Sequence, residues 1–395
     1  MIFPHNYESP LKRCEIRISD KVYDVTHWRA KHPGGAELLD KFHNADATDA
    51  FYALHSNDAV AMLKNIKSAP ASEKQIPREE LAAKFESWRQ DLIKDGWFQR
   101  RWYADFVLTI LPCTAWLVVG TYLAWSYPLI ATLMIGIGMQ QAGWMAHDYM
   151  HGRGTLSWWI GNLYGGLVNG FSPSWWGHKH NTHHCFPNRL EHDSDIQNEP
   201  ILHLWFPEKG KDAWFRKYQH YYYLFVYAFL YVSWRMQSIQ FVMGSKNWFE
   251  RALIVVNYAW LLCLPWKVAV GSILVGGWLV AVVVTANHQP EPILEANDNY
   301  NYCVDQFTTT RGVDVKSWFL GYIFGGMQYQ LEHHMFPFMP KYYYPSIRPL
   351  MKKFAEENKI PFKVSGVVEI MKMNYDTMKR YAQDFDPAAS PKKHN

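Results

Sequence analysis

The chain has 395 residues, enough for two or three ordinary domains, and its formal net charge at pH 7 is only +4. A charge this small gives no reason to expect a nucleic-acid partner. Phe, Trp and Tyr make up 16% of the residues, and because Trp and Tyr concentrate at membrane–water interfaces, this composition favours a membrane-embedded protein. The five cysteines form no CxxC pair, which argues against a disulfide framework and indicates a reducing compartment.

Residues 10–66 form a small polar segment with its own apolar positions. It contains His32-Pro-Gly-Gly35, which Val22-Tyr-Asp-Val-Thr26 precedes and Asp46-Ala-Thr-Asp-Ala-Phe51 follows. With these motifs the segment resembles cytochrome b5, a small α+β domain whose haem iron is held by two histidines. The matching positions are His32 and His55. Two imidazoles leave no open position on the iron, so the resemblance implies a haem b that passes electrons instead of binding oxygen.

Residues 67–100 are expected to connect this domain to the rest of the chain. Ser68-Ala-Pro-Ala-Ser72 has the composition of a short linker. Pro77 to Lys94 carries apolar residues at helical spacing and is expected to form an amphipathic surface helix. These apolar positions are Leu81, Phe85, Trp88 and Leu92.

Two long apolar runs follow, Phe106 to Trp125 and Pro128 to Ala146. Each is close to the roughly 20 residues that a helix needs to cross a bilayer. Arg100 and Arg101 precede the first run, whereas the link at Ser126-Tyr127 carries no charge. Because positive charge gathers on the cytoplasmic side, this asymmetry places the N-terminus in the cytoplasm and predicts a helical hairpin that returns there.

A second pair of expected spans runs from Trp248 to Pro265 and from Val268 to Asn287. Two other apolar stretches, Leu156 to Phe171 and Tyr221 to Val242, are interpreted as interfacial or re-entrant helices. A single crossing by either of them would place the histidine clusters described below on different sides of the membrane. Arg235 also disfavours a lipid-exposed crossing by the second stretch. The sequence therefore predicts four transmembrane helices.

Three histidine clusters lie at the ends of the apolar stretches: His147-Asp-Tyr-Met-His151, His180-Asn-Thr-His183-His184 and Gln330-Leu-Glu-His333-His334. Histidines three or four residues apart share one face of a helix, so each cluster is a metal half-site. The seven imidazoles exceed what one tetrahedral zinc can use. Imidazole suits iron, copper, nickel or zinc, so the pattern predicts a two-metal site at a membrane surface and leaves the metal open.

In this order, boxes of the form HxxxH, HxxHH and QxxHH resemble those of the membrane fatty acid desaturases, from about residue 100 to 370. Gln330 in the third box and the fused b5-like domain are similar to the front-end subgroup. The resemblance implies a mainly α-helical integral membrane protein, with four transmembrane helices and a cytosolic helical cap holding two non-haem iron ions, in a domain over residues 101–370. The implied iron ligands are His147, His151, His180, His183, His184, His333 and His334.

Two further positions extend this ligand set. His288 ends the last expected span and matches an additional ligand of the family, although a histidine can also simply cap a helix C-terminus. Gln330 takes the place of a ligating histidine, where its amide oxygen can bind weakly or orient a water. Asp148, Glu332 and the segment His192-Asp-Ser-Asp195 are candidates to hold ligand imidazoles by the distal N–H, with solvated surface charges as the alternative.

The remaining histidines and aromatic runs are expected to be structural. His178 lies off the HxxHH pattern and is expected to support a neighbouring group or to be exposed. The runs Trp175-Trp176 and Tyr221-Tyr-Tyr223 are expected to anchor interfacial helices instead of lining a substrate tunnel.

The resemblance implies a front-end desaturase, which inserts a cis double bond between an existing one and the carboxyl end of a polyunsaturated acyl chain. Removing hydrogen from an unactivated methylene needs an oxidant that side chains cannot supply. The implied co-substrate is O2, with electrons from NAD(P)H arriving through cytochrome b5 reductase and the haem. The fatty acyl substrate, carried as acyl-CoA or phospholipid, would lie in an apolar tunnel next to membrane lipid.

Four alternatives remain. A sphingolipid long-chain-base desaturase shares the b5 module and the QxxHH box, and a lipid hydroxylase uses a similar iron core. A non-catalytic, membrane-anchored b5 electron carrier would not need the box histidines, and a zinc hydrolase would not need a haem. Enzymes acting at Δ4, Δ5, Δ6 and Δ8 share these boxes, so the position of the new bond, the acyl carrier and the oligomeric state stay open.

The chain from Tyr342 onward is polar, rich in lysine and expected to be helical, and residues 371–395 are expected to form a cytosolic tail. The tail ends Lys392-Lys393-His394-Asn395, which resembles the dilysine retrieval signal of endoplasmic-reticulum membrane proteins. The sequence therefore predicts a multi-pass protein of that membrane with both termini in the cytosol.

Overall fold

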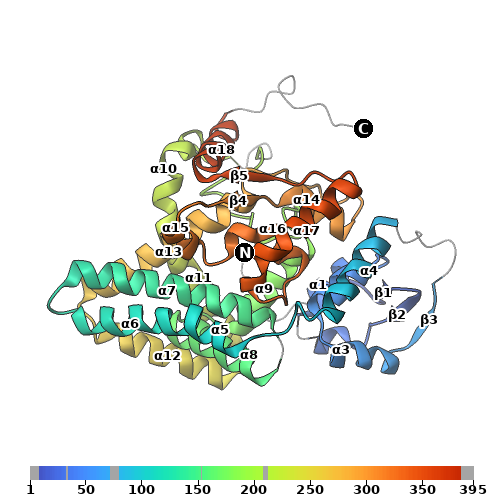
Figure 1. Cartoon of the computed structure of the whole chain (residues 1–395), viewed down its shortest axis with the longest axis horizontal. Coiled ribbons are helices and arrows are strands. Elements are labelled where there is room, and N and C mark those ends of the chain that lie inside the picture. Colours follow the sequence, from blue (N-terminus) through green and yellow to red (C-terminus); the bar gives the residue numbers. More distant parts are fainter. Residues whose placement is uncertain (1–8, 33, 72–79, 153, 208–211, 384–395) are drawn as a thin grey trace.

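The computed structural model describes residues 9–32, 34–71, 80–152, 154–207 and 212–383. Figure 1 shows the N-terminal domain in blue at one side, the long helices of the middle of the chain in the lower half, and the C-terminal helices in red above them. The described part is mainly helical, with one three-stranded and one two-stranded sheet. The dilysine sequence at the end of the chain lies outside the described residues.

The N-terminal domain is a small α+β unit, as expected. Its elements are β1 (Glu15–Ile18), β2 (Lys21–Asp24), a 3-10 turn (Arg29–Lys31), α1 (Ala36–Lys41), α2 (Thr48–Leu54), α3 (Asn57–Met62), a second 3-10 turn (Leu63–Asn65) and β3 (Ser68–Pro70). The antiparallel sheet has the order β1-β2-β3. Strand β3 comes from the residues predicted to be a linker, because the open edge of β2 offers backbone hydrogen bonds to a third strand.

Helix α4 (Glu80–Lys94) forms as predicted, but protein covers its apolar face. Phe85 stacks on Phe336 with ring centroids 5.7 Å apart, and Trp88 stacks on Phe354 at 4.9 Å. Phe85 and Leu92 are buried. Helical spacing identifies an apolar face but not the surface that covers it, so the expected surface helix is part of the core.

Among the described residues, three helices are long and apolar enough to cross a membrane: Trp102–Leu123, Pro128–His151 and Trp266–His288. The first is continuous from α5 (Trp102–Asp105) through a π-helical segment (Phe106–Ile110) to α6 (Leu111–Leu123), and the others are α7 (Pro128–His151) and α13 (Trp266–His288). They contain three of the four predicted spans. The other predicted span forms α12 (Trp248–Leu262), whose 15 residues are fewer than the usual number for a span.

The two stretches interpreted as interfacial or re-entrant form shorter helices between α7 and α12. They are α8 (Thr155–Ile160), a π-helical segment (Gly161–Val168), α10 (Gln219–Val226) and α11 (Leu230–Gly244), with 3-10 turns at Arg216–Tyr218 and Tyr227–Phe229. Arg235 of α11 is buried and donates to Asn257 Oδ1 over 2.7 Å, so its guanidinium is paired inside the protein. Helix α9 (Pro173–Cys185) separates the two stretches and carries the second histidine cluster.

We call the C-terminal part, residues 302–380, the cap. Its elements are α14 (Tyr302–Thr309), β4 (Gly312–Asp314), α15 (Trp318–Phe324), a 3-10 turn (Met327–Tyr329), α16 (Gln330–Met335), a second 3-10 turn (Lys341–Tyr343), α17 (Tyr344–Glu357), β5 (Val364–Gly366) and α18 (Val367–Arg380). Strands β4 and β5 pair in parallel. One apolar core runs from the N-terminal domain into this cap, so the two parts are packed together.

Candidate metal centre

The histidines converge where the C-terminal ends of α7 and α13 meet α9 and α16. Five of them place one ring nitrogen each within 4.8 Å of the others, and we call them the five-histidine cluster: His147, His151, His180, His184 and His333. The Nε2 atom of His180 lies 2.8 Å from that of His147 and 3.0 Å from that of His184. All five side chains are buried, so their ring nitrogens face one another away from water.

A second group, the three-histidine cluster, consists of His183, His288 and His334. The Gln330 amide lies between two of them, with its nitrogen 3.2 Å from Nε2 of His288 and of His334. The two ends of an amide are exchanged by a flip, so the Gln330 oxygen can take the same place. His288 is buried as the last residue of α13, which places it within the site instead of at an exposed helix end.

The two clusters are adjacent because two helices contribute to both. His183 and His184 are consecutive on α9, and their rings point to different clusters. The rings of His184 and His334 stack with centroids 4.3 Å apart. The predicted metal residues therefore all come together, as two neighbouring half-sites with Gln330 at the second.

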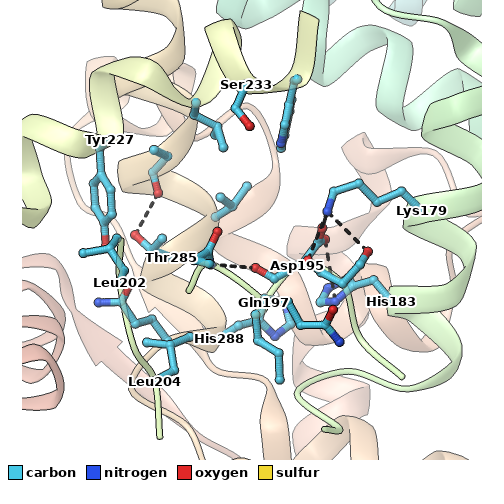
Figure 2. A pocket seen from close by; sticks show the side chains of 18 of the residues that line it. Lys179, His183, Asp195, Gln197, Leu202, Leu204, Tyr227, Ser233, Thr285 and His288 are labelled. Carbon is cyan, nitrogen blue, oxygen red and sulfur yellow. Dashed lines mark hydrogen bonds and ion pairs between the residues drawn. The ribbon is translucent and has the colours of Figure 1, made fainter. Parts of the chain in front are cut away.

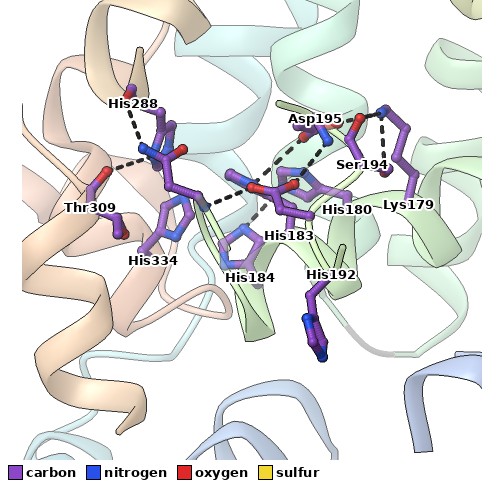
Figure 3. Close-up of polar contacts among 12 residues, drawn as sticks. Lys179, His180, His183, His184, His192, Ser194, Asp195, His288, Thr309 and His334 are labelled. Carbon is purple, nitrogen blue, oxygen red and sulfur yellow. Dashed lines mark hydrogen bonds and ion pairs between the residues drawn. The ribbon is translucent and has the colours of Figure 1, made fainter. Parts of the chain in front are cut away.

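Outer partners fix the direction of several of these rings. Nδ1 of His183 lies 2.9 Å from Asp193 Oδ2, that of His333 lies 3.0 Å from the Tyr344 hydroxyl, and that of His334 lies 2.8 Å from Gln306 Oε1. Nδ1 of His288 faces the backbone oxygen of Thr309 at 3.1 Å (Figure 3). With Nδ1 occupied by these partners, Nε2 is the nitrogen that each ring offers to the centre.

Two acidic residues that were predicted to hold imidazoles form ion pairs with arginines instead. Asp148 pairs with Arg100, Nη1 to Oδ2 at 2.9 Å, and Glu332 pairs with Arg348, Nε to Oε1 at 2.8 Å. Both carboxylates are buried, and a buried carboxylate is held best by a guanidinium that bonds it directly. Within the segment 192–195, Asp193 is the residue that bonds an imidazole closely, whereas Asp195 lies 3.8 Å from His183 and 2.5 Å from Lys179 Nζ.

The donor chemistry fits metal ions. Burial lowers the pKa of His184, His333 and His334 well below the usual range, and the neighbouring imidazoles lower it further. Neutral imidazoles have a free lone pair, and Nε2 of His333 has no hydrogen-bond partner among the described residues. A set of neutral imidazoles without thiolate is compatible with iron, as it is with copper, nickel or zinc.

Asp193 is the carboxylate closest to the second half-site. Burial alone would raise the pKa of Asp193, but His183 and the backbone N–H groups of Asp195 and Asn188 outweigh it, and the pKa falls below its usual value. Asp193 therefore stays ionised and can hold the imidazole of His183 in one tautomer and orientation.

A cavity of about 270 Å³ opens beside the metal centre (Figure 2). His183 and His288 lie on its wall, Lys179 and Asp195 form a polar side, and Leu202 continues an apolar side. The apolar lining is Ile196, Leu202, Leu204, Val226, Phe229, Leu230, Ala281, Val284, Met327 and Met378. A long apolar ligand with one polar end matches this lining.

The aromatic residues around the cavity differ from the prediction. Trp176 lines the cavity and stacks on His180 with centroids 4.6 Å apart, while Trp175 is fully buried. Neither tryptophan anchors an exposed interfacial helix, because Trp175 is buried and Trp176 faces the cavity. Tyr221 is exposed as predicted, whereas Tyr223 is buried.

The two predicted haem ligands face each other in the N-terminal domain. Nε2 of His32 lies 3.5 Å from Nε2 of His55. Their Nδ1 atoms face backbone oxygens, of Gly35 at 3.4 Å and of Phe51 at 3.0 Å. A Cβ on Gly34 would lie 2.8 Å from Cε1 of His32, so glycine is needed there. This pair of inward-facing, backbone-anchored imidazoles fits the axial positions of a haem.

Comparison with known proteins agrees with both sites. Residues 123–366 match the model of the fatty acid desaturase family, and residues 5–81 match that of the cytochrome b5-like haem/steroid binding domain. The chain therefore belongs to the fatty acid desaturase family, the membrane-associated oxidoreductases, and carries a fused cytochrome b5-like domain.

Several full-length relatives are desaturases. A Δ6 fatty-acid desaturase of Caenorhabditis elegans is 29% identical over 91% of this chain and 94% of its own length. An acyl-lipid 8-desaturase of Rebecca salina is 29% identical over 92% and 90%. A Δ5 fatty acid desaturase of C. elegans is 29% identical over 84% and 87%.

Proposed function

We propose that this protein is a front-end fatty acyl desaturase, which inserts a cis double bond between an existing double bond and the carboxyl end of a polyunsaturated acyl chain. One observation carries the proposal: eight buried histidines form two adjacent half-sites beside an apolar cavity, in a chain that also holds a bis-histidine haem site. The relatives named above act at Δ5, Δ6 and Δ8, so their names support the class of reaction and not one position.

The five-histidine and three-histidine clusters would each hold one iron, with Gln330 completing the second half-site. Together with O2, two irons supply the oxidant that breaks an unactivated C–H bond. Asp193, Gln306 and Tyr344 fix the imidazoles through Nδ1, so the ligands need no reorganisation when metal binds. Imidazoles without thiolate ligands also tolerate a strong oxidant next to them.

The acyl chain would lie along the apolar side of the cavity, with one methylene facing the clusters. Leu202, Leu204 and Val226 exclude water from this side, and Lys179, paired with Asp195, marks the polar side. The depth of the cavity measured from the head group would set which bond is oxidised. Whether the acyl chain is carried as acyl-CoA or as phospholipid would depend on which head group binds at the polar side of the cavity.

His32 and His55 would hold haem b, which accepts electrons one at a time from NAD(P)H through a cytochrome b5 reductase. Held by these two imidazoles, the haem would have no open position for O2 and would therefore only transfer electrons. The oxygen chemistry is thereby confined to the metal centre.

We further propose that α12 is the fourth transmembrane helix and that both termini lie in the cytosol. His288 is the last residue of α13, His147 lies near the end of α7, and both line the same cavity, so these two helices end on the same side. Residues 263–265 connect α12 to α13 directly, and α12 must therefore run in the opposite direction. Location in the endoplasmic reticulum and the domain boundaries 10–66, 67–100, 101–370 and 371–395 stay predictions.

Yeast cells that express the protein and are fed defined polyunsaturated fatty acids test the proposal, with mass spectrometry of the double-bond positions. The expected product has one new double bond on the carboxyl side of an existing one. Products desaturated in the long-chain base of ceramide would favour the sphingolipid alternative, and purely hydroxylated products would exclude desaturation.

Two variants distinguish the role of the metal centre from that of the haem site. His183→Ala should abolish the product and lower bound iron while leaving the haem absorbance intact. His32→Ala should remove the haem absorbance while the protein keeps its non-haem iron. Retained desaturation in His183→Ala would contradict the di-iron assignment.

A further inference from the structure

Helix α9 contacts both the histidine clusters and the N-terminal domain. His180, His183 and His184 join the two clusters, whereas His178 contacts the N-terminal domain. At about 100° per residue, a side chain two positions before His180 lies on nearly the opposite side of the helix. The contact is close, because a Cβ built on Gly35 would lie 3.0 Å from both Cε1 and Nδ1 of His178.

Gly35 belongs to the loop that orients a haem ligand. Its backbone oxygen lies 3.4 Å from Nδ1 of His32, and its φ of +88° is one that side chains rarely adopt. His178 therefore packs on the residue that fixes the ring of His32. On its other side, the half-buried His178 ring meets Phe241 of α11 edge-on, with centroids 5.5 Å apart.

The contact between the N-terminal domain and α9 continues from His178, in the middle of the helix, to the C-terminal end of α9. Phe42 of the N-terminal domain packs on Phe186, the residue after α9, with ring centroids 4.8 Å apart, and on Tyr300 at 5.4 Å. Lys41 Nζ donates to the backbone oxygen of His192 over 3.1 Å. The N-terminal domain thus rests against the middle and the C-terminal end of the helix that carries three box histidines.

We propose that His178 is a positioning residue that seats the haem-binding loop on α9 and so fixes the path from the haem to the metal centre. The rise per residue of about 1.5 Å puts His178 within one turn of His180, so the path crosses a single helix. With haem held by His32 and His55 and iron held by the box histidines, this path would carry one electron at a time, the haem being oxidised by one electron as the metal centre is reduced by one. Electron delivery rests on the proposed function, whereas the docking contact does not.

The first test measures docking in the full-length holoprotein by hydrogen–deuterium exchange of the amides in residues 34–42. His178→Ala should raise their exchange rate roughly tenfold, because a contact that holds the loop is lost. His178→Phe keeps a flat ring of similar size and should restore wild-type exchange. His220→Ala is the matched control, because His220 is also a half-buried histidine with aromatic neighbours, Tyr221 and Tyr375, far from the loop.

The second test follows the haem by absorbance. In His178→Ala the spectrum and the midpoint potential should match the wild type, while reoxidation of the pre-reduced haem by O2 in the presence of substrate slows roughly tenfold. Wild-type exchange in His178→Ala would overturn the proposal, and so would a lost haem or a shifted potential, which would assign His178 to haem binding instead. Faster exchange together with no desaturation even in the wild type would leave the docking role standing and refute the proposed function.

Discussion

In the candidate metal centre, an outer partner holds Nδ1 of four imidazoles, those of His183, His288, His333 and His334. Asp193 shows this best: its two oxygens accept from Nδ1 of His183, from the backbone N–H of Asn188 and from that of Asp195. Three of the roughly four acceptor directions of this fully buried carboxylate are thereby used. An amide in this position would turn one N–H group toward another.

We expect Asp193→Asn to lower iron content and desaturation about 10- to 100-fold, as is typical when an outer partner of a metal ligand is lost. Iron per haem, measured by mass spectrometry of the metals, checks this prediction. Asp314→Asn is the control, because Asp314 forms only an exposed pair with Lys316 at 3.7 Å and should keep wild-type iron. Unchanged iron in Asp193→Asn would mean that the ring of His183 needs no such anchor.

The two interpretations of His288, as a metal ligand and as a helix cap, predict different iron contents for a variant that lacks its imidazole. As a ligand of the second half-site, its loss in His288→Ala should lower non-haem iron from about two toward about one per chain. As a helix cap it would cost only about 0.3–1 kcal/mol of stability and leave iron unchanged. The iron-to-haem ratio of the purified protein decides between them, with His203→Ala, a buried histidine outside both clusters, as the control.

At the scale of elements, helix α4 packs against the C-terminal part of the chain and stabilises it. Phe85 is fully buried and its ring meets those of Phe336, Phe354 and Tyr302. Phe85→Ala should therefore cost about 3–5 kcal/mol and lower the unfolding temperature in detergent. Lys84→Ala removes an exposed ion pair with Glu80 on the same helix and should change stability by less than about 0.5 kcal/mol. Equal unfolding temperatures for the two variants would contradict the packing of α4.

Element boundaries show what the sequence could and could not predict. Hydropathy ends the second span at Ala146 and the last at Asn287, but α7 continues to His151 and α13 to His288, because protein and not lipid surrounds those last turns. The spacing of the histidine boxes was sufficient to predict that their histidines come together. The outer partners Gln306 and Tyr344 were missed, since they lie 28 and 11 residues from the rings they hold and follow no local pattern.

At the scale of the whole molecule, the membrane topology depends on whether α12 crosses the membrane. α12 is short, but Trp248 and Trp266 flank it and are 74% and 71% exposed, as expected of side chains at the two membrane interfaces. The side chains of Val255 and Leu262 between them are also exposed, at 66% and 85%, and need an apolar environment. Lipid can provide that environment if α12 crosses the membrane.

Cys263 reports directly on this crossing. It lies in the turn between α12 and α13 and is the exposed one among the cysteines, all of them in the described residues. If α12 crosses, Cys263 is on the lumenal side, and a membrane-impermeant maleimide should label it only after sealed microsomes are opened with detergent. The label should disappear in Cys263→Ser. In that background, Lys379→Cys on α18 should react with intact microsomes if the C-terminal helices face the cytosol, as we propose. Labelling of Cys263 in intact vesicles would mean that α12 does not cross, and then the ends of α7 and α13 could not meet by the route proposed here.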